Sequence, residues 1–569
     1  MDTYIIPAEV SVKDAEFFRQ KWQEYKSGEL DFKGFEKIRV AFGIYEQRVK
    51  DSYMARVKTH GGGVGAKEFA RLGELCKRYA NGFLHLSTRA SIQLHFVKDD
   101  EFIELENEIA AINMTTRGAC GDCVRGVVCD ALAGVAKDEA FNVLPYANAI
   151  TSMLIGRADS YGLSRKFKIA FSGSKADRAN ATITDVGFVA TKKDGKKGFI
   201  VYVAGGMGSK PRLGDKFKSF IPANEAFLYA QAIKLVFAKT GDYEHRNSAR
   251  LRHAAEKLGK ETIFKMIEDE VAKIRASSEK WRLDIKEPRG VKPLISEPRV
   301  RFSAAQKAWA QNYVTAQKQK GYYYAVVPFL WGNVRGDDAI KLSKALIKLG
   351  LKDSLFISRD QHIILKNLKK TDLIALYPVI AEISPMSADP RVFANMTPCT
   401  GASTCRLGIC RPKGAVEAIH DHIRNSDLDF SLLKDIVIKM SGCPNSCTAH
   451  QNANLGFMGG TRREDGRSLP YYSVFAGGEL KEGKSKFGKK VGGVAAYHVP
   501  EFVYQTLKKF TQVKSEFKNF NDWVDNGGDS VIAELCGLYQ RVGTFEENPR
   551  AYYDYGADAL FGETLKDKI

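Results

Sequence analysis

Four cysteines in the C-terminal half of the chain carry its clearest chemical signal. Cys399 and Cys405 lie in Pro-Cys-Thr-Gly-Ala-Ser-Thr-Cys, and Cys443 and Cys447 lie in Ser-Gly-Cys-Pro-Asn-Ser-Cys. Four thiolates brought together from two loops can hold an iron–sulfur cluster. The neighbouring glycine, proline and asparagine residues favour tight turns whose backbone amides point at the sulfur atoms. The quartet therefore indicates an electron-transfer protein.

The chain also contains an internal duplication with an offset of about 270 residues. At an offset of 270, residues 53–57 align with residues 323–327, and Arg89 aligns with Arg359. At nearby offsets Cys123 aligns with Cys405. The matches keep the same order, and the period is far too long for a solenoid. We therefore expect two related halves, called copy one and copy two, that face each other around a pseudo-twofold axis.

The two copies have kept different chemistry at equivalent or neighbouring positions. Copy one has Arg56, Arg125, Lys166 and Lys168 where copy two has Val326, Leu407, Asp435 and Val437. Strand alternation along residues 164–171 puts Lys166 and Lys168 on one face, where two ammonium groups repel each other unless an anion lies between them. This predicts an anion pocket on copy one and a metal cluster on copy two, with a flat group between them.

The elements that position these residues follow the same order in both copies. Each copy opens with an apolar strand and a glycine turn. A helical stretch (67–79 and 337–349) and another strand (83–97 and 354–365) come next. Strand–helix–strand units with short connections predict mixed α/β or α+β layers, and we expect the α+β class, with mixed sheets and helices.

Composition and charge narrow the class of protein. The 569 residues are 44% hydrophobic and 27% charged, as in ordinary globular proteins, and 86 basic against 67 acidic residues give a net charge of +19. No segment approaches the ~20 apolar residues of a membrane span, and no signal peptide opens the chain, so we expect a cytoplasmic protein with reduced cysteines. The basic excess suits an anionic substrate, an anionic cofactor and an acidic protein partner.

These motifs resemble the siroheme-containing sulfite and nitrite reductases of the ferredoxin-dependent type, and most of all the sulfite reductases. Besides the cysteine motifs, the resemblance rests on segments 43–48, 86–95, 119–125 and 165–168. It extends over roughly residues 43 to 510. Nothing resembles a flavin or nicotinamide domain, so the electrons must come from outside the chain.

The resemblance implies two cofactors and the residues around them. A four-iron four-sulfur cluster would be bound by Cys399, Cys405, Cys443 and Cys447. Cys447 would also be the proximal ligand of a siroheme iron, and Arg89 and Gln93 would contact the siroheme. His85 stands where some relatives have a siroheme-binding arginine, and Tyr45 with Cys120 stand where some relatives have a Tyr–Cys thioether.

The resemblance also implies the substrate site and the domain order. Arg56, Arg125, Lys166 and Lys168 would hold the substrate oxygens, and a lysine at the position of Lys168 accompanies sulfite reduction, where nitrite enzymes more often have asparagine. Ferredoxin-like half-domains would surround a central siroheme and cluster. The expected segments are an arm (1–44), a ferredoxin-like half-domain (45–112), a siroheme-reductase domain with the substrate cations (113–270), a linker (271–310), a second half-domain (311–384), a second siroheme-reductase domain with the cysteines (385–510) and a helical extension (511–569).

The expected function is the six-electron reduction of sulfite to sulfide by a monomer that receives electrons from an acidic ferredoxin. Ferredoxin-dependent reduction of nitrite to ammonia is the first alternative. A non-catalytic iron–sulfur protein and a basic nucleic-acid-binding protein are further alternatives, although the chain has no recognisable nucleic-acid-binding motif. A structural zinc site is disfavoured, because zinc cysteines usually pair with spacings of two to four residues.

Overall fold

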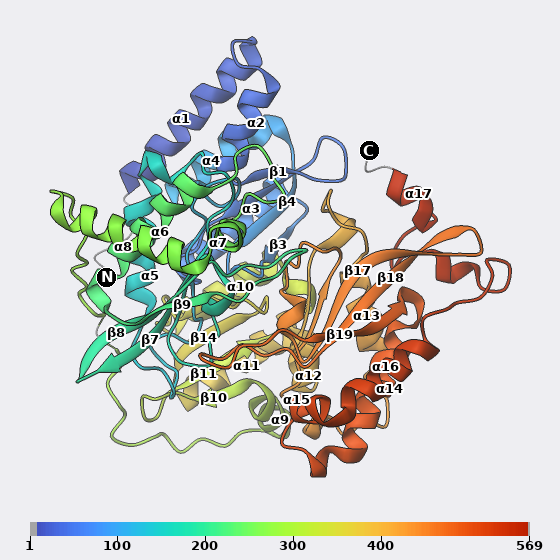
Figure 1. Ribbon diagram of the computed structural model, residues 1–569. Coiled ribbons are helices and arrows are strands. Elements are labelled where there is room, and N and C mark those ends of the chain that lie inside the picture. Colours follow the sequence, from blue (N-terminus) through green and yellow to red (C-terminus); the bar gives the residue numbers. More distant parts are fainter. Residues whose placement is uncertain (1–7, 289, 567–569) are drawn as a thin grey trace.

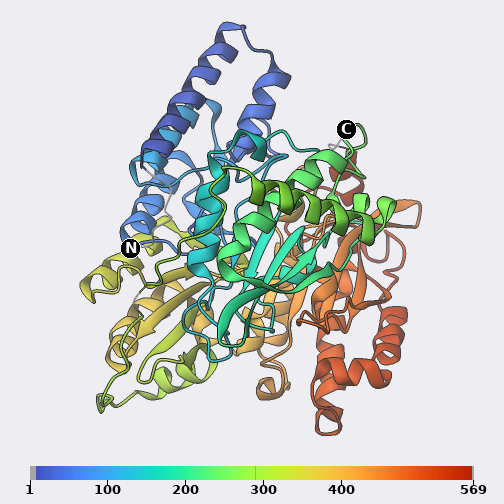
Figure 2. The ribbon, with the colours of Figure 1, turned by 60° about the vertical axis from the view of Figure 1, so that its left-hand side comes forward.

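The computed structural model describes residues 8–288 and 290–566. The chain begins with an arm of two helices, α1 (Ala8–Ser27) and α2 (Phe32–Ala41), which stands at the top of Figure 2. Helix α1 packs along α4 (Phe102–Ala111), and Phe18 of α1 is fully buried among aromatic rings. The arm is therefore part of the folded body. None of the described helices has the length and apolar character needed to cross a membrane.

Each copy contributes a small antiparallel sheet. In copy one the order is β1 (Ile44–Glu46), β2 (Tyr53–Val57), β4 (Ile92–Val97) and β3 (Phe83–Leu86). In copy two it is β10 (Val314–Ala316), β11 (Tyr323–Val327), β14 (Ile363–Leu368) and β13 (Leu355–Ile357). Strand β12 (Asn333–Arg335) of copy two pairs with β3 and so extends the sheet of copy one.

The expected single strands at 83–97 and 354–365 are each a hairpin of two strands, so that prediction was wrong. In copy one the turn closes through hydrogen bonds between Ser87 and Ser91, and Ala90 adopts a left-handed φ of 52°. Apolar residues on both sides of the turn made the two strands look like one continuous strand in the sequence. The correction matters because Arg89 and its counterpart Arg359 lie in these turns.

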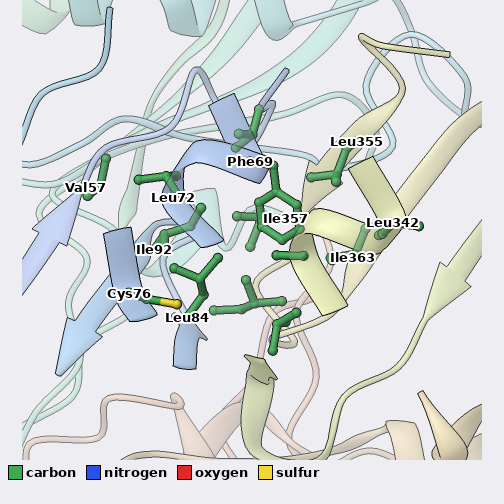
Figure 3. Packing of buried hydrophobic residues seen from close by; sticks show 14 of the residues in the cluster. Val57, Phe69, Leu72, Cys76, Leu84, Ile92, Leu342, Leu355, Ile357 and Ile363 are labelled. Carbon is green, nitrogen blue, oxygen red and sulfur yellow. The ribbon is translucent and has the colours of Figure 1, made fainter. Parts of the chain in front are cut away.

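The two half-domains share one hydrophobic core. Helix α3 (Ala66–Tyr79) lies against α10 (Gly336–Lys348), and Figure 3 shows Leu72 and Ile92 of copy one in the same cluster as Leu342 and Ile357 of copy two. The helices approach closely at two glycines: a Cβ on Gly73 would lie 2.7 Å from the Gly336 oxygen. Larger side chains there would push the helices apart.

Each copy also contributes a five-stranded mixed sheet, and the two sheets have the same strand order. The strands of copy one are β5 (Val128–Cys129), β6 (Ile169–Ser172), β7 (Val186–Lys193), β8 (Lys196–Val203) and β9 (Asp215–Pro222). Those of copy two are β15 (Met396–Pro398), β16 (Ile438–Ser441), β17 (Leu455–Glu464), β18 (Arg467–Ala476) and β19 (Lys489–Ala495). In both, the first two pairings are parallel and the last two antiparallel. The architecture is α+β with the predicted duplication.

Helices cover these sheets and join the copies (Figure 1). Copy one has α5 (Leu144–Ile155), α6 (Ala226–Thr240), α7 (Leu251–Leu258) and α8 (Lys260–Ala276). Copy two has α9 (Ala304–Tyr313), α11 (Lys370–Ile383), α12 (Arg391–Ala394), α13 (Pro412–Ile423) and α14 (Val499–Val513). The C-terminal extension has α15 (Phe520–Trp523), α16 (Asp529–Leu538) and α17 (Phe561–Lys566). The described residues between α8 and α9 form neither helix nor strand.

Candidate functional site

Arg56 is held by the sheet of copy one. It lies on β2 directly opposite Gln93 of β4. With its amide oxygen turned toward Arg56, Gln93 accepts a hydrogen bond from Arg56 Nε at 2.9 Å, and its amide nitrogen donates to His95 Nε2 at 3.3 Å. Arg56 Nη1 also donates to the carbonyl of Ala119 at 3.3 Å. These bonds fix the guanidinium of a predicted substrate residue.

Arg125 lies beside Arg56. Its Nε donates to the same Ala119 carbonyl at 3.0 Å, and its Nη1 donates to Gly121 at 3.4 Å. The side chain is buried. Two guanidinium groups that share one carbonyl repel each other, so an anion bound beside them is favoured.

Lys166 and Lys168 lie just before β6. Phe167, between them, and Ile169, the first residue of β6, are both fully buried. Burial, reinforced by Arg250 and Arg125, lowers the pKa of Lys166 to about 7. Burial, reinforced by Arg89 and Arg250, holds the pKa of Lys168 well below its usual range. The lysines thus share one crowded positive environment with the arginines of copy one.

Arg89 and Arg359 bring the two hairpin turns together. Arg89 Nη2 donates to the carbonyl of Gly126 at 2.7 Å. Its pKa is lowered well below the usual range, first by burial and then by Arg125 and Arg359. Since Arg89 and Arg359 are pseudo-twofold mates, the turns meet near the axis.

The cations of this region lack anionic partners. No described carboxylate lies within ion-pair distance of Arg56, Arg89, Arg125, Lys166, Lys168 or Arg359. Arg125 is buried, and the other five are partly buried. Buried charges normally pair with opposite charge. This arrangement fits a cofactor with several carboxylates.

The four cysteines are close to one another in copy two. Cys399 follows β15, and its sulfur accepts a hydrogen bond from the Gly442 amide at 3.1 Å. Burial, reinforced by Cys447, raises the pKa of Cys399, and burial with Cys447 and Cys405 raises that of Cys443 to about 11. Burial and Cys447 likewise raise the pKa of Cys405. The thiolates of these cysteines would repel one another, so cationic iron bound among them would stabilise their deprotonated form.

No three His, Cys, Asp or Glu side chains in the described part of the chain converge on a single metal ion. A cluster does not require this, because its ligands bind separate iron atoms around a cage. The residues present therefore fit a cluster as well as a polycarboxylate ring.

Cys447 connects the two copies. It is the exposed member of the quartet, and the hydroxyl of Thr88, next to Arg89, donates to its carbonyl at 3.0 Å. The presence of Cys447 also partly opposes the lowering of the Lys166 pKa. The structure thus places predicted cations of copy one close to Cys447, a predicted ligand of copy two.

Several residues of the site escaped the sequence analysis. Arg250 and Asp185 form a buried ion pair at 2.7 Å, and Asp185 also accepts the backbone amide of Lys168 at 2.9 Å. Lys58 is buried near Arg125, and burial lowers its pKa to about 8. Of these residues, only Lys58 could have been predicted from the sequence. It lies two residues after Arg56, so strand alternation puts both side chains on one face.

Tyr45 and Cys120 lie close together, as the thioether hypothesis requires. The Tyr45 hydroxyl accepts a hydrogen bond from Gly121, next to Cys120, at 3.3 Å. Burial, reinforced by Cys120, raises the pKa of Tyr45. The cross-link itself stays a prediction.

Comparison with known proteins connects this geometry to a family. Residues 45–112 match the nitrite/sulfite reductase ferredoxin-like half domain, and residues 120–275 match the nitrite and sulphite reductase 4Fe-4S domain. Both matches lie in copy one, although the cysteine quartet belongs to copy two.

Relatives of both activities resemble the chain over most of its length. It is 25% identical over 478 residues to "Sulfite reductase [ferredoxin] 1" of Mycolicibacterium paratuberculosis, covering 83% of this chain and 81% of the relative. It is 25% identical over 518 residues to "Assimilatory ferredoxin-dependent nitrite reductase" of Haloferax mediterranei, covering 87% and 86%.

A solved structure shares the fold. The Mycobacterium tuberculosis NirA protein superposes with a TM-score of 0.76 at 22% identity, covering 93% of this chain and 98% of that one. The unpaired cations of copy one, the cysteine quartet and these similarities agree. The chain belongs to the siroheme-dependent sulfite and nitrite reductase family, whose cofactors are siroheme and a four-iron four-sulfur cluster.

Proposed function

We propose that the protein reduces sulfite to sulfide with six electrons supplied by ferredoxin. The observation that carries the proposal is the pair Lys166 and Lys168, which lies among the arginines of copy one, with Lys166 also near Cys447. Two lysines and two arginines in one positive region suit a dianion with three oxygen atoms.

In this proposal Cys399, Cys405, Cys443 and Cys447 would hold the cluster, and Cys447 would also hold the siroheme iron. Arg89, Arg359 and Gln93 contact the carboxylates and the edge of the ring. The bound cofactors supply the electron transfer and the iron that binds the substrate. Thr88 holds the Cys447 loop through its hydrogen bond to the Cys447 carbonyl.

The residues of copy one have separate tasks. Arg56 and Arg125, both held by the Ala119 carbonyl, provide fixed positive charge that orients the substrate oxygens. Lys166, with its pKa lowered to about 7, can hold a proton for transfer to an oxygen that leaves as water. Lys168 provides the second proton-bearing group, fixed through its backbone by Asp185.

Nitrite is the second candidate substrate, because relatives named as nitrite reductases match the chain as well as those named for sulfite. Nitrite has one negative charge and two oxygen atoms, so it needs fewer cations. Lys168 favours sulfite, since in the resembling family asparagine is more common here in nitrite enzymes.

The deciding experiment compares kcat/KM for sulfite and nitrite in the purified protein. We expect sulfite to be preferred, and Lys168→Asn to lower kcat/KM for sulfite by at least tenfold, or about 1.4 kcal/mol, with a smaller effect on nitrite. Lys175→Asn, an exposed lysine of the loop after β6, serves as the matched control. A clear preference of the parent for nitrite would establish the alternative.

The donor and the setting belong to the same proposal. A ferredoxin should support turnover, and the protein should act as a cytoplasmic monomer. The visible spectrum separates the remaining classes: siroheme gives Soret and red bands, a cluster alone gives a broad shoulder, and a nucleic-acid-binding protein gives neither.

A further inference from the structure

Helix α13 begins against both cysteine loops. A Cβ on Gly401, in the loop after Cys399, would lie 2.2 Å from Pro412 Cδ, and one on Gly442 would lie 3.2 Å from the same atom. The amides of Ile409 and Cys410 donate to the Gly442 carbonyl at 2.8 and 2.9 Å. The first turn of α13 therefore has a fixed position beside the quartet.

Lys413, the second residue of α13, brings an ammonium group to this place. Its Nζ donates to Asn333 Oδ1 at 3.3 Å and has no carboxylate partner among the described residues. Asn333 Oδ1 also lies 2.9 Å from His85 Nδ1, so one amide oxygen joins Lys413 to the histidine of copy one. The ammonium is thus oriented by a neutral group, and no carboxylate among the described residues neutralises its charge.

Helix α13 begins against the loop that follows Cys399, and at this place Cys399 is the cysteine that favours the positive charge of Lys413. Burial lowers the pKa of Lys413 to about 8, and Cys399 is the neighbour that opposes this lowering. Cys399 also accepts the Gly442 amide, so its sulfur receives both a backbone dipole and a nearby ammonium. The other cysteines have different cationic neighbours: Arg48 near Cys405, and Lys166 near Cys447.

A cluster gains negative charge when it is reduced, and its potential responds to net charge and hydrogen bonds around the sulfur atoms. Positive charge in a protein interior stabilises the reduced form more strongly than it would in water. We propose that Lys413 raises the reduction potential of the cluster through Cys399 and so makes the cluster easier to reduce by the electron donor. This inference rests on the proposed ligation of the cluster by the quartet.

A residue that raises the cluster potential is useful because electrons flow from the donor to the cluster. Electrons from a ferredoxin enter the cluster only if its reduced form is sufficiently stable. Lys413 comes from copy two, and its hydrogen bond goes to Asn333. We therefore assign it a tuning role, in which its charge acts on the cluster through a ligand.

The test is an EPR-monitored redox titration of the purified holoenzyme and three variants at Lys413. Lys413→Met removes the charge and the hydrogen bond, Lys413→Gln removes the charge while retaining a donor for Asn333, and Lys413→Arg retains the charge. We expect both neutral variants to stabilise the reduced cluster at least tenfold less, which lowers a one-electron potential by about 59 mV. Lys413→Arg should stay near the parent.

Lys366→Met is the matched control. Lys366 is also a buried lysine, its Nζ donates to the Ala133 carbonyl at 2.9 Å, and its cysteine neighbour is Cys129, outside the quartet. Its loss should leave the cluster potential unchanged. Siroheme absorbance and iron content are measured in each sample to confirm equal loading.

The outcomes separate this inference from the proposed function. Neutral Lys413 variants with the potential of the parent overturn the tuning role, even when sulfite turnover with a chemical reductant persists. An equal shift in Lys366→Met overturns it too, since the effect would then be general. A parent protein without a cluster signal would instead contradict the proposed function itself.

Discussion

The buried pair of Arg250 and Asp185 holds Lys168, so its loss should have a large local effect. Arg250 Nη2 lies 2.7 Å from Asp185 Oδ2, which also accepts the Lys168 amide. With an effective dielectric constant of about 20, charges at this distance attract by about 6 kcal/mol. Removing one partner of a buried pair typically costs about 3–5 kcal/mol, because the other charge stays buried. We expect Asp185→Asn to destabilise the start of β6 by that amount.

Hydrogen exchange measured by mass spectrometry on the segment that contains Lys168 provides the assay. A loss of about 3–5 kcal/mol corresponds to exchange between about a hundredfold and a few thousandfold faster, up to the limit set by opening of the whole domain. Adding Arg250→Met to Asp185→Asn should restore much of the protection, because no unpaired guanidinium then remains. The kcat/KM for sulfite should fall in the single variant as Lys168 loses its support.

An exposed ion pair supplies the control. Lys508 and Asp427 lie 3.0 Å apart with exposed side chains, so Asp427→Asn should change exchange in its own segment by less than about 1 kcal/mol. The reasoning is refuted if exchange around Lys168 in Asp185→Asn stays within threefold of the parent. A double variant no better protected than the single one would show that the unpaired charge is not the cause.

Three further predictions concern the cluster, the anion site and helix α4. Cys443→Ala should lose cluster iron and sulfide, whereas Cys410→Ala, which removes a buried thiol bonded to the Gly460 carbonyl, should retain both; chemical analysis of the purified variants decides. Lys166 is protonated below its pKa of about 7, and bound carboxylates raise that pKa. The kcat/KM for sulfite should therefore decline as the pH rises above neutrality. Lys166→Met should flatten that pH profile. Burial raises the pKa of Glu106 to about 8, so the folded chain keeps a proton that the unfolded chain loses above about pH 4.5. The free energy of unfolding should therefore fall by up to ~5 kcal/mol as the pH rises between those two values. Glu106→Gln should remove that decline in thermal unfolding measured at pH 5 and pH 8, and an unchanged slope would contradict it.

The sequence predicted the parts of the molecule that local pattern and repetition determine. The duplication predicted the paired architecture, and strand alternation predicted that Lys166 and Lys168 lie opposite Phe167. The boundary of the hairpins was missed, because the apolar run from Phe83 to Val97 conceals a turn that its hydrogen bonds and the φ of Ala90 create.

Residues that join distant segments were beyond sequence reasoning. Asp185 and Arg250 are 65 residues apart, and neither lies in a motif. Lys413 is oriented by Asn333, 80 residues away on the strand of copy two that pairs with the sheet of copy one. Their roles depend on the packing of α13, β12 and the mixed sheets, which no short stretch of residues encodes.

The pairing of β12 of copy two with the sheet of copy one has an evolutionary consequence. Once β3 relied on a strand from the second repeat, and α3 and α10 met at Gly73 and Gly336, neither repeat could survive as a separate gene product. Excision of one would leave the other with an open strand edge and a bare apolar surface, both of which promote aggregation. The two copies therefore stayed fused in one chain. Each copy could then lose the functional residues that the other copy retained.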